Sequence, residues 1–177
     1  MFLGVRELEL RKIRFEMDFR PGDIDLSDSK LNLCGPLQAQ GTAELVGSIQ
    51  EIRVCGRLRG QAEFECDRCL ETARLPLEGE MDLFYRPAKL LDGNGEMEVN
   101  RDEIGVGFYE GPGLELAEVV REQVMLWLPM QRLCREDCRG ICPVCGENRN
   151  LAGCVCPAGP RDARWAGLGA ANLFEKD

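Results

Sequence analysis

Most of the cysteines in this chain occur in close pairs, and paired cysteines are typical of sites that hold a metal ion. The 177 residues include ten cysteines and no histidine. Four pairs account for eight of the ten: Cys66 and Cys69, Cys134 and Cys138, Cys142 and Cys145, and Cys154 and Cys156. A structural zinc ion takes four tetrahedral ligands, and a short loop with two cysteines supplies two of them. The pattern therefore predicts two zinc ions, each held by four thiolates.

The distances between the pairs along the chain indicate how they are shared. Only eight residues separate the last two pairs, which are predicted to form one local site, although about 15–20 residues are usual in zinc ribbons. The first two pairs lie 64 residues apart, and a site that joins them would contribute to tertiary stability because metal binding is coupled to folding. One site is then Cys66, Cys69, Cys134 and Cys138, and the other is Cys142, Cys145, Cys154 and Cys156. A rival arrangement places one complete site within residues 134–145.

Two other thiol chemistries fit parts of the pattern. Cys66 and Cys69 alone resemble a thioredoxin-type redox pair, although no helix follows them whose N-terminus would lower a thiol pKa. An iron–sulfur cluster is also held by four thiolates. Cys34 and Cys55 have no close partner in the sequence and are predicted to be buried as small apolar residues.

The composition argues against catalysis. Without histidine, the chain lacks the base of Ser-His-Asp and Cys-His enzymes and the ligands of HExxH zinc hydrolases. A zinc ion with four thiolates has no open position at which to activate water. No glycine-rich loop is followed by the lysine and helix that bind phosphate, and adjacent carboxylates such as Asp102 and Glu103 are typical of a solvated surface. We therefore expect a binding protein without a small-molecule substrate, not an enzyme.

The acidic residues are concentrated in the middle of the chain. The net charge is −9, and residues 75–120 carry eleven acidic and three basic side chains. Such a segment favours a basic partner, for example a ribosomal protein. RNA binding requires neutralisation of phosphates, so any RNA contact would be local. The candidate contact residues are Arg132, Arg135, Arg139 and Arg149 near the cysteines and Arg53, Arg57, Arg59 and Arg68 along the expected strands, although ordinary surface arginines would give the same pattern.

The elements that must hold the first cysteine pair are strands. Apolar and polar residues alternate over residues 11–19, and a similar pattern recurs from residue 37 to residue 85, on both sides of Cys66 and Cys69. Glycines in this region are predicted to mark turns or bulges, at positions 35, 41, 47, 56, 60 and 79. The pattern predicts a curved antiparallel β-sheet.

One long helix is predicted between this sheet and the later cysteines. Residues 114–128 contain good helix formers and an apolar stripe, and Pro129 ends the helix. Its C-terminal end is nearly apolar and is expected to be buried against the sheet. Before it, residues 87–113 are expected to form an acidic loop with one short strand at residues 96–99. A short C-terminal helix is expected over residues 162–174.

These elements predict an α+β fold, with a curved antiparallel sheet, one long helix and a C-terminal cysteine-rich segment that binds zinc. The expected domains are a β-rich core over residues 1–133 and a zinc-knuckle segment over residues 134–177. No apolar run reaches the ~18 residues that span a bilayer, and the first residues become charged too early for a signal peptide. Disulfide-rich chains are usually short and secreted, and this chain is expected to be neither. We therefore expect a cytoplasmic protein with reduced thiols.

The order and spacing of these motifs resemble one known family. The resemblance rests on Phe64–Leu70, on Val124–Pro129, on Cys134–Asn150 with Cys154 and Cys156, and on Asp162–Trp165. Together they are similar to the bacterial YceD family, described as large-ribosomal-RNA-subunit accumulation proteins, over roughly residues 10–175. Ala163 and Arg149 depart from the family pattern, in which proline and leucine are usual at these positions.

The resemblance implies a non-catalytic factor for accumulation, processing or assembly of the large-subunit (23S) ribosomal RNA. Its partner would be the precursor of that RNA or a basic ribosomal protein. Two alternatives from other functional classes are a thiol redox or metal-responsive protein that uses Cys66 and Cys69, and a general protein-interaction adaptor.

Overall fold

The computed structural model describes residues 1–91, 105–151 and 153–156, and it divides into two compact units. The first, here called the sheet unit, comprises Met1–Glu65 and Thr72–Arg132. The second, here called the cysteine unit, comprises Cys66–Glu71 and the residues from Leu133 onward. The expected strand at residues 96–99 and the expected helix at residues 162–174 lie outside the described residues.

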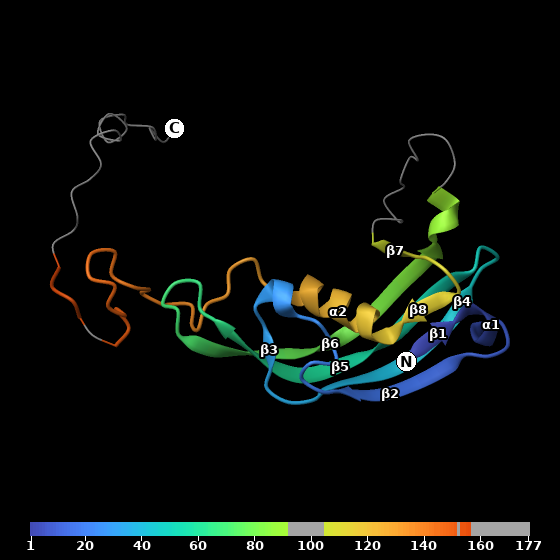
Figure 1. Cartoon of the computed structure of the whole chain (residues 1–177), viewed down its shortest axis with the longest axis horizontal. Helices are drawn as coiled ribbons and strands as arrows, with labels where there is room; N and C mark the ends of the chain where they lie inside the picture. Colours follow the sequence, from blue (N-terminus) through green and yellow to red (C-terminus); the bar gives the residue numbers. More distant parts are fainter. Residues whose placement is uncertain (92–104, 152, 157–177) are drawn as a thin grey trace, which may run out of the picture. The chain divides into compact units, whose positions relative to one another are not determined.

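The sheet unit is built around a six-stranded sheet (Figure 1). Its strands are β2 (Ile13–Phe19), β3 (Asn32–Leu33), β4 (Leu37–Val46), β5 (Glu51–Glu65), β6 (Thr72–Pro87) and β7 (Val106–Tyr109). The order is β2-β4-β5-β6-β7, and β3 pairs with the end of β5. All pairs are antiparallel except β6 and β7, which are parallel. The predicted α+β fold with a mostly antiparallel sheet is confirmed, and the parallel strand is a departure from it.

Short elements complete the sheet unit. A second, two-stranded sheet pairs β1 (Phe2–Gly4) with β8 (Gly113–Glu115), and α1 (Val5–Leu8) follows β1 directly. Two 3-10 turns, η1 (Ser27–Ser29) and η2 (Ala88–Leu91), lie in the connections. The sequence pattern predicted neither β1 nor β7, because strands of three or four residues are too short to show an alternation. No helix among the described residues has the length and apolar character needed to cross a membrane.

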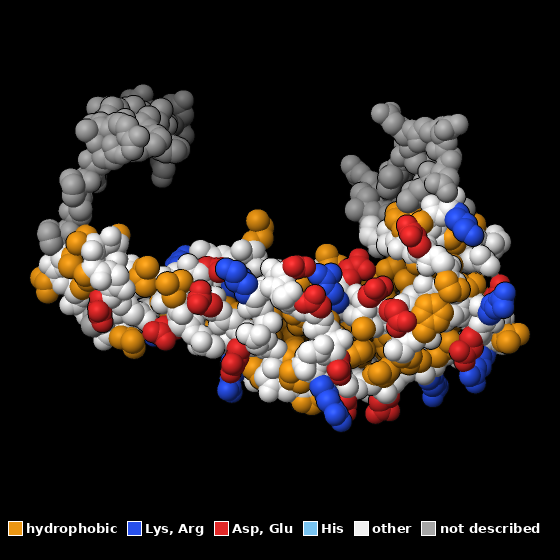
Figure 2. Space-filling view, in the orientation of Figure 1, with side chains coloured by type: hydrophobic (Ala, Val, Ile, Leu, Met, Phe, Trp, Pro, Cys, Tyr) orange, Lys and Arg blue, Asp and Glu red, His pale blue; other side chains and the backbone are white. Residues whose placement is uncertain are grey.

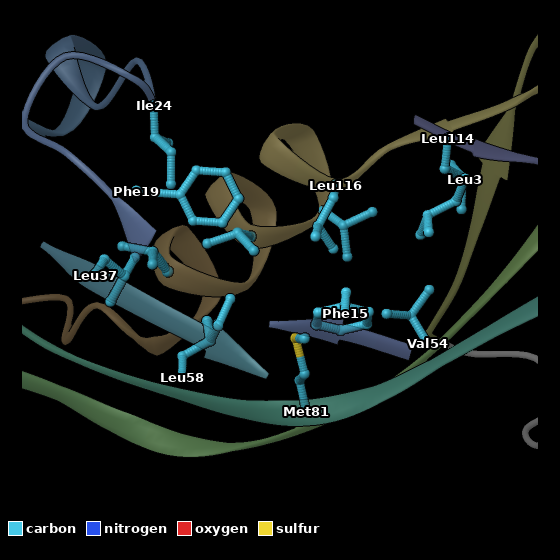
Figure 3. Packing of buried hydrophobic residues seen from close by; sticks show 14 of the residues in the cluster. Leu3, Phe15, Phe19, Ile24, Leu37, Val54, Leu58, Met81, Leu114 and Leu116 are labelled. Atoms are coloured by element: carbon cyan, nitrogen blue, oxygen red, sulfur yellow. The ribbon is translucent and has the colours of Figure 1, made fainter. Parts of the chain in front are cut away.

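The alternation along the strands gives the sheet one apolar and one polar face. In β5, Ile52, Val54 and Leu58 are fully buried, whereas Arg57 and Arg59 are exposed. Side chains from several elements meet on the apolar face of the sheet. Figure 3 shows Phe15 of β2, Leu58 of β5 and Met81 of β6 in one core with Leu116 of the long helix. Each buried aliphatic side chain contributes about 1.5–3 kcal/mol, so burial of this core stabilises the sheet unit.

The long helix α2 (Leu116–Trp127) covers this core. Its buried positions are Leu116, Val119, Val120, Gln123 and Val124. It begins two residues later than predicted because residues 113–115 pair with β1, and it ends at the residues before Pro129, since a residue that precedes proline disfavours helical backbone. The expectation of a buried C-terminal end is only partly met: Trp127 packs against the core, but Leu126 is 67% exposed.

Four glycines predicted to mark turns or bulges lie inside the strands, namely Gly41, Gly56, Gly60 and Gly79. Gly41 pairs with Gly56, and a Cβ atom at Gly41 would lie 2.2 Å from the carbonyl oxygen of Cys55 and 2.7 Å from Cζ of Phe15. A Cβ atom at Gly79 would lie 2.8 Å from Trp127. These positions need glycine because a neighbouring backbone or ring occupies the space of a side chain.

Candidate metal centres

The first cysteine pair lies in the loop that connects β5 to β6. The backbone N–H of Leu70 donates to the carbonyl of Cys66 at 2.9 Å, and the N–H of Cys66 donates to the carbonyl of Glu71 at 2.9 Å. Leu70 has a φ of 62°, a left-handed conformation that side chains rarely adopt. The loop therefore folds back on itself and turns both thiols to one side, as a metal-binding knuckle does.

A second loop repeats this backbone arrangement 76 residues later in the sequence. The N–H of Gly146 donates to the carbonyl of Cys142 at 2.8 Å, and the N–H of Cys142 donates to the carbonyl of Glu147 at 2.8 Å. Gly146 has a φ of 75°, which glycine adopts without strain. Two segments that differ in sequence around their Cys-x2-Cys core thus form the same knuckle.

The eight paired cysteines come together in two groups of four. The first group, here called site 1, is Cys66, Cys69, Cys134 and Cys138, and the second, here called site 2, is Cys142, Cys145, Cys154 and Cys156. Within each group every Sγ atom lies within 4.8 Å of the other three. The rival arrangement, with all four ligands within residues 134–145, does not match these groups.

The spacing of the sulfur atoms fits a single tetrahedral ion. Four thiolates bound at about 2.3 Å to one Zn²⁺ place their sulfurs about 3.8 Å apart. In site 1 the Sγ atoms of Cys69 and Cys134 are 3.6 Å apart, and those of Cys66 and Cys138 are 3.8 Å apart. An iron–sulfur cluster distributes its four thiolates over several iron atoms and needs a wider arrangement. The donor set therefore fits zinc better than a cluster.

Backbone N–H groups point at one sulfur in each site. Burial opposes ionisation of Cys66, but the N–H groups of Cys69, Cys134 and Arg68 outweigh it and lower the pKa of the Cys66 thiol to about 6. At Cys142, N–H groups of the knuckle likewise lower the thiol pKa to about 6. Such donors stabilise a thiolate, which is the form that binds metal.

Two thiols of site 2, those of Cys154 and Cys156, have a raised pKa because a neighbouring cysteine of the site stands beside each of them. A hydrogen bond to Cys145, together with burial, raises the pKa of the Cys156 thiol to about 12. Like charges at this distance disfavour each other, so four thiolates require a cation among them. The electrostatics of the site thus agree with its geometry in favouring a bound metal ion.

The two sites differ in how far they are covered by protein. In site 1, Cys66 is fully buried and Cys69 and Cys138 are each 4% exposed, and Leu133 packs against them. In site 2, Cys142 is 4% exposed, whereas Cys145 is an exposed residue. Three of the four cysteines are therefore buried in site 1, where Cys134 is exposed, but only one is buried in site 2.

The two cysteines outside these sites are not buried, and that expectation was wrong. Cys34 is exposed, and Cys55 is half-buried on the polar face of the sheet, one position from the buried Val54. The Sγ of Cys55 donates to Oδ1 of Asp82 at 3.0 Å. Because side chains alternate between the two faces of a strand, the position in β5 decides this exposure, not the residue type.

Of the four candidate arginines near the later cysteines and Arg68 in the first cysteine loop, three are engaged within the protein. Arg68 donates to the carbonyl of Cys138 at 3.2 Å, and Arg132 of the sheet unit donates to the carbonyl of Ser29. Arg135 donates to Oδ1 of Asn150 at 3.0 Å and forms an ion pair with Asp137 at 3.3 Å. Arg139 and Arg149 are exposed residues of the cysteine unit.

Sequence reasoning missed two asparagines beside the sites. The amide of Asn150 donates to the Sγ of Cys138 at 3.4 Å, and the amide of Asn148 donates to Oε1 of Glu71 at 3.2 Å. The available signal was the position of two amide side chains between the two cysteine pairs of site 2. Ligand spacing alone does not identify such residues, because their role depends on contacts with a segment far away in the sequence.

Comparisons with known proteins agree with these motifs. A family model described as large ribosomal RNA subunit accumulation protein YceD matches residues 54–170, from β5 to beyond the last cysteine. Uncharacterised proteins of Mycobacterium bovis and of two Mycobacterium tuberculosis strains are 33% identical over 103 residues. That match covers 57% of this chain and 47% of each relative, so the chain spans about half the length of these curated relatives. No solved structure matches the chain.

The family model covers about two thirds of the chain and includes both knuckles and all eight clustered cysteines. Strands β1–β4 precede the matched residues. The description of the family names a role in accumulation of the large ribosomal RNA subunit and names no reaction. By this match, the chain belongs to the YceD family.

Proposed function

We propose that this protein is a non-catalytic factor that supports accumulation, processing or assembly of the large-subunit (23S) ribosomal RNA, and that two zinc ions stabilise its cysteine unit. The observation that carries the proposal is the pair of four-thiol sites inside the region matched by the family model. Site 1 would hold one ion and site 2 the other. In this role zinc supplies folding free energy.

The donor sets explain why the zinc would be structural. Four thiolates close the coordination sphere of a tetrahedral ion, and no position is left at which water could be activated. The chain also has no histidine to act as a base beside the metal. The sites therefore hold segments of the chain together and leave binding to the surfaces that they organise.

The charges of the sheet unit limit which partners its polar face attracts. Ion pairs across the strands neutralise much of the polar face, among them Arg53–Asp82, Arg57–Glu78, Arg74–Glu63 and Arg86–Glu51. Figure 2 shows acidic and basic side chains interspersed over the face of this unit that is in view. In the cysteine unit, Arg139 and Arg149 are exposed and would supply a local contact to ribosomal RNA. A basic ribosomal protein, attracted by the net charge of −9, is the alternative partner.

Complementation of a depleted strain tests the proposal. Depletion should reduce mature large-subunit ribosomal RNA and raise its precursors, and the wild-type protein should restore both. The double substitution Cys66→Ser and Cys69→Ser should fail to restore them. The matched control, Cys34→Ser with Cys55→Ser, removes two thiols outside both sites and should complement fully. Unchanged RNA levels on depletion, or full complementation by the first variant, would contradict the proposal.

Crosslinking to precursor particles identifies the direct partner. If RNA is the partner, ultraviolet crosslinks to large-subunit ribosomal RNA should form and should decrease with Arg139→Gln and Arg149→Gln. Crosslinks to ribosomal proteins alone, unaffected by these substitutions, would instead assign the contact to a basic ribosomal protein.

A thiol redox function is the second candidate, because the lowered pKa of Cys66 would also suit a redox thiol. Alkylation of the native protein separates the two functions. A structural zinc site protects its thiols, so mass spectrometry should find label on Cys34 and Cys55 alone, and on all ten cysteines after chelation in denaturant. Rapid native labelling of Cys66 and Cys69 would instead support the redox function.

A further inference from the structure

One asparagine side chain stands between the two metal sites and uses all of its polar atoms within the cysteine unit. The Nδ2 of Asn150 donates to the Sγ of Cys138, a site 1 cysteine, at 3.4 Å. Its Oδ1 accepts the backbone N–H of Arg139 at 2.8 Å and the guanidinium of Arg135 at 3.0 Å. These donors fix the orientation of the amide, so the NH₂ group faces the sulfur.

The position of Asn150 depends on the hairpin that carries the second knuckle. The backbone N–H of Asn150 donates to Oδ1 of Asn148 at 2.9 Å. Asn148 forms a bridge with Ile141, and directly inside that bridge Cys142 pairs with Glu147. The turn of this hairpin is the Cys142–Gly146 knuckle, which supplies half of site 2. An ordered site 2 therefore places Asn150 against a ligand of site 1.

The same hairpin also contacts the first knuckle. The N–H of Ile141 donates to the carbonyl of Arg68, between the two cysteines of that loop, at 3.0 Å. The amide of Asn148 donates to Glu71, whose backbone carbonyl closes the first knuckle. At Gly140 a Cβ atom would lie 3.0 Å from the carbonyl oxygen of Arg68, so the two segments approach closely. Three contacts thus connect the hairpin of site 2 to the ligand loops of site 1.

We propose that Asn150 and Asn148 couple the two metal sites, so that both zinc ions bind and leave as one unit. The inference rests on the proposed zinc binding and goes beyond it. Without the ion of site 2, the hairpin keeps these contacts but has no core of its own, because Val144 and Leu151 are exposed. Asn150 then loses its fixed place, and the Cys138 thiolate loses a hydrogen-bond donor. Donors of this kind typically change metal affinity 10- to 100-fold.

Cadmium-substituted protein allows each site to be followed separately by cadmium NMR during titration with a chelator. In the wild type, the two resonances should disappear together. With Asn150→Ala, the site 1 resonance should disappear first, at 10- to 100-fold lower chelator concentration. Asn150→Asp retains the acceptor for Arg135 and Arg139 but places a carboxylate against the sulfur, so it should weaken site 1 at least as much. The matched control is Asn32→Ala, at an exposed position of β3, which should behave as the wild type.

A second variant tests the coupling without changing Asn150. Cys154→Ser with Cys156→Ser removes half of site 2, assigns the remaining resonance to site 1, and should also lower the affinity of site 1. Independent loss of the two ions from the wild type, or unchanged site 1 affinity in both the Asn150→Ala and the Cys154→Ser, Cys156→Ser proteins, would overturn the coupling alone. A wild-type protein purified without chelator that contains no zinc would instead overturn the proposed metal binding itself.

Discussion

The two units of this protein contrast in what holds them together. In the sheet unit, more than twenty buried apolar residues form one core between α2 and the apolar face of the sheet. In the cysteine unit, the buried cluster consists of Cys66, Cys69 and Cys138 with Leu133 packed against them. Segments with so little apolar surface to bury need a cross-link or a metal. The sheet unit is thus stabilised by hydrophobic burial, whereas the cysteine unit has two four-thiol groups in place of such a core.

Removal of metal should produce the largest difference in stability between the two units. Structural zinc contributes about 10–16 kcal/mol to small domains, so chelation should unfold the cysteine unit and leave the sheet unit folded. Hydrogen exchange should show loss of protection at the amides of Cys142 and Gly146, which are hydrogen-bonded in the second knuckle, and continued protection in β5. Loss of protection in both units, or in neither, would contradict the contrast.

A cavity in the core should give the opposite result. Leu58 is fully buried, and Leu58→Ala should destabilise the sheet unit by about 2–5 kcal/mol because it removes packed atoms. Denaturant unfolding followed by tryptophan fluorescence measures the loss, and metal content after mild dialysis should not change. Leu10→Ala is the matched control, because Leu10 is 86% exposed and should cost little. An equal effect of both substitutions would mean that the core does not carry the stability.

One substitution in each knuckle should change its stability, and the two changes should have opposite signs. A Cβ atom at Gly146 would meet no atom within 4 Å, so Gly146→Ala tests backbone strain alone and should weaken the knuckle by about 1–2 kcal/mol. Leu70→Gly relieves the same strain at the first knuckle and should strengthen it by up to about 1 kcal/mol. Amide exchange within the cysteine unit measures both, with the unfolding midpoint of the sheet unit as an unchanged reference. Effects of the same sign would show that the knuckles are not equivalent.

The smallest expected effect concerns an ion pair of the sheet unit. Hydrogen bonds from Arg53 and from Cys55 lower the pKa of Asp82 to about 2. Because this pKa lies below the ordinary value of about 3.9, the stabilisation is complete at neutral pH and is lost as the pH falls through 2. Arg53→Gln should raise the NMR titration midpoint of Asp82 toward 3.9. Chelation and Arg74→Gln should leave the titration midpoint of Asp82 unchanged. A midpoint that moved on metal removal would show that the bound metal influences the ionisation of Asp82.

Features that depend on the spacing of residues along the chain could be predicted from the sequence, and features that depend on contacts between distant segments could not. The cysteine groups follow from pair separation, and α2 and β2 follow from periodic apolar positions, because these signals are local. The parallel pairing of β7 depends on a partner strand that precedes it by about twenty residues, and no local pattern encodes it. The glycines of β4 and β6 depend on rings that pack against them from other elements, namely Phe15 and Trp127. Asn150 was missed for the same reason, since its partner sulfur lies in another segment.

The first knuckle is also the turn of a long β-hairpin, and this has an evolutionary consequence. β5 and β6 are in register from Ile52 and Tyr85 to Glu65 and Thr72, and Cys66–Glu71 only connects their ends. A two-residue turn such as Asn-Gly closes an antiparallel hairpin equally well. A descendant sequence can therefore shed Cys66 and Cys69, and with them site 1, without altering one pair of the ladder.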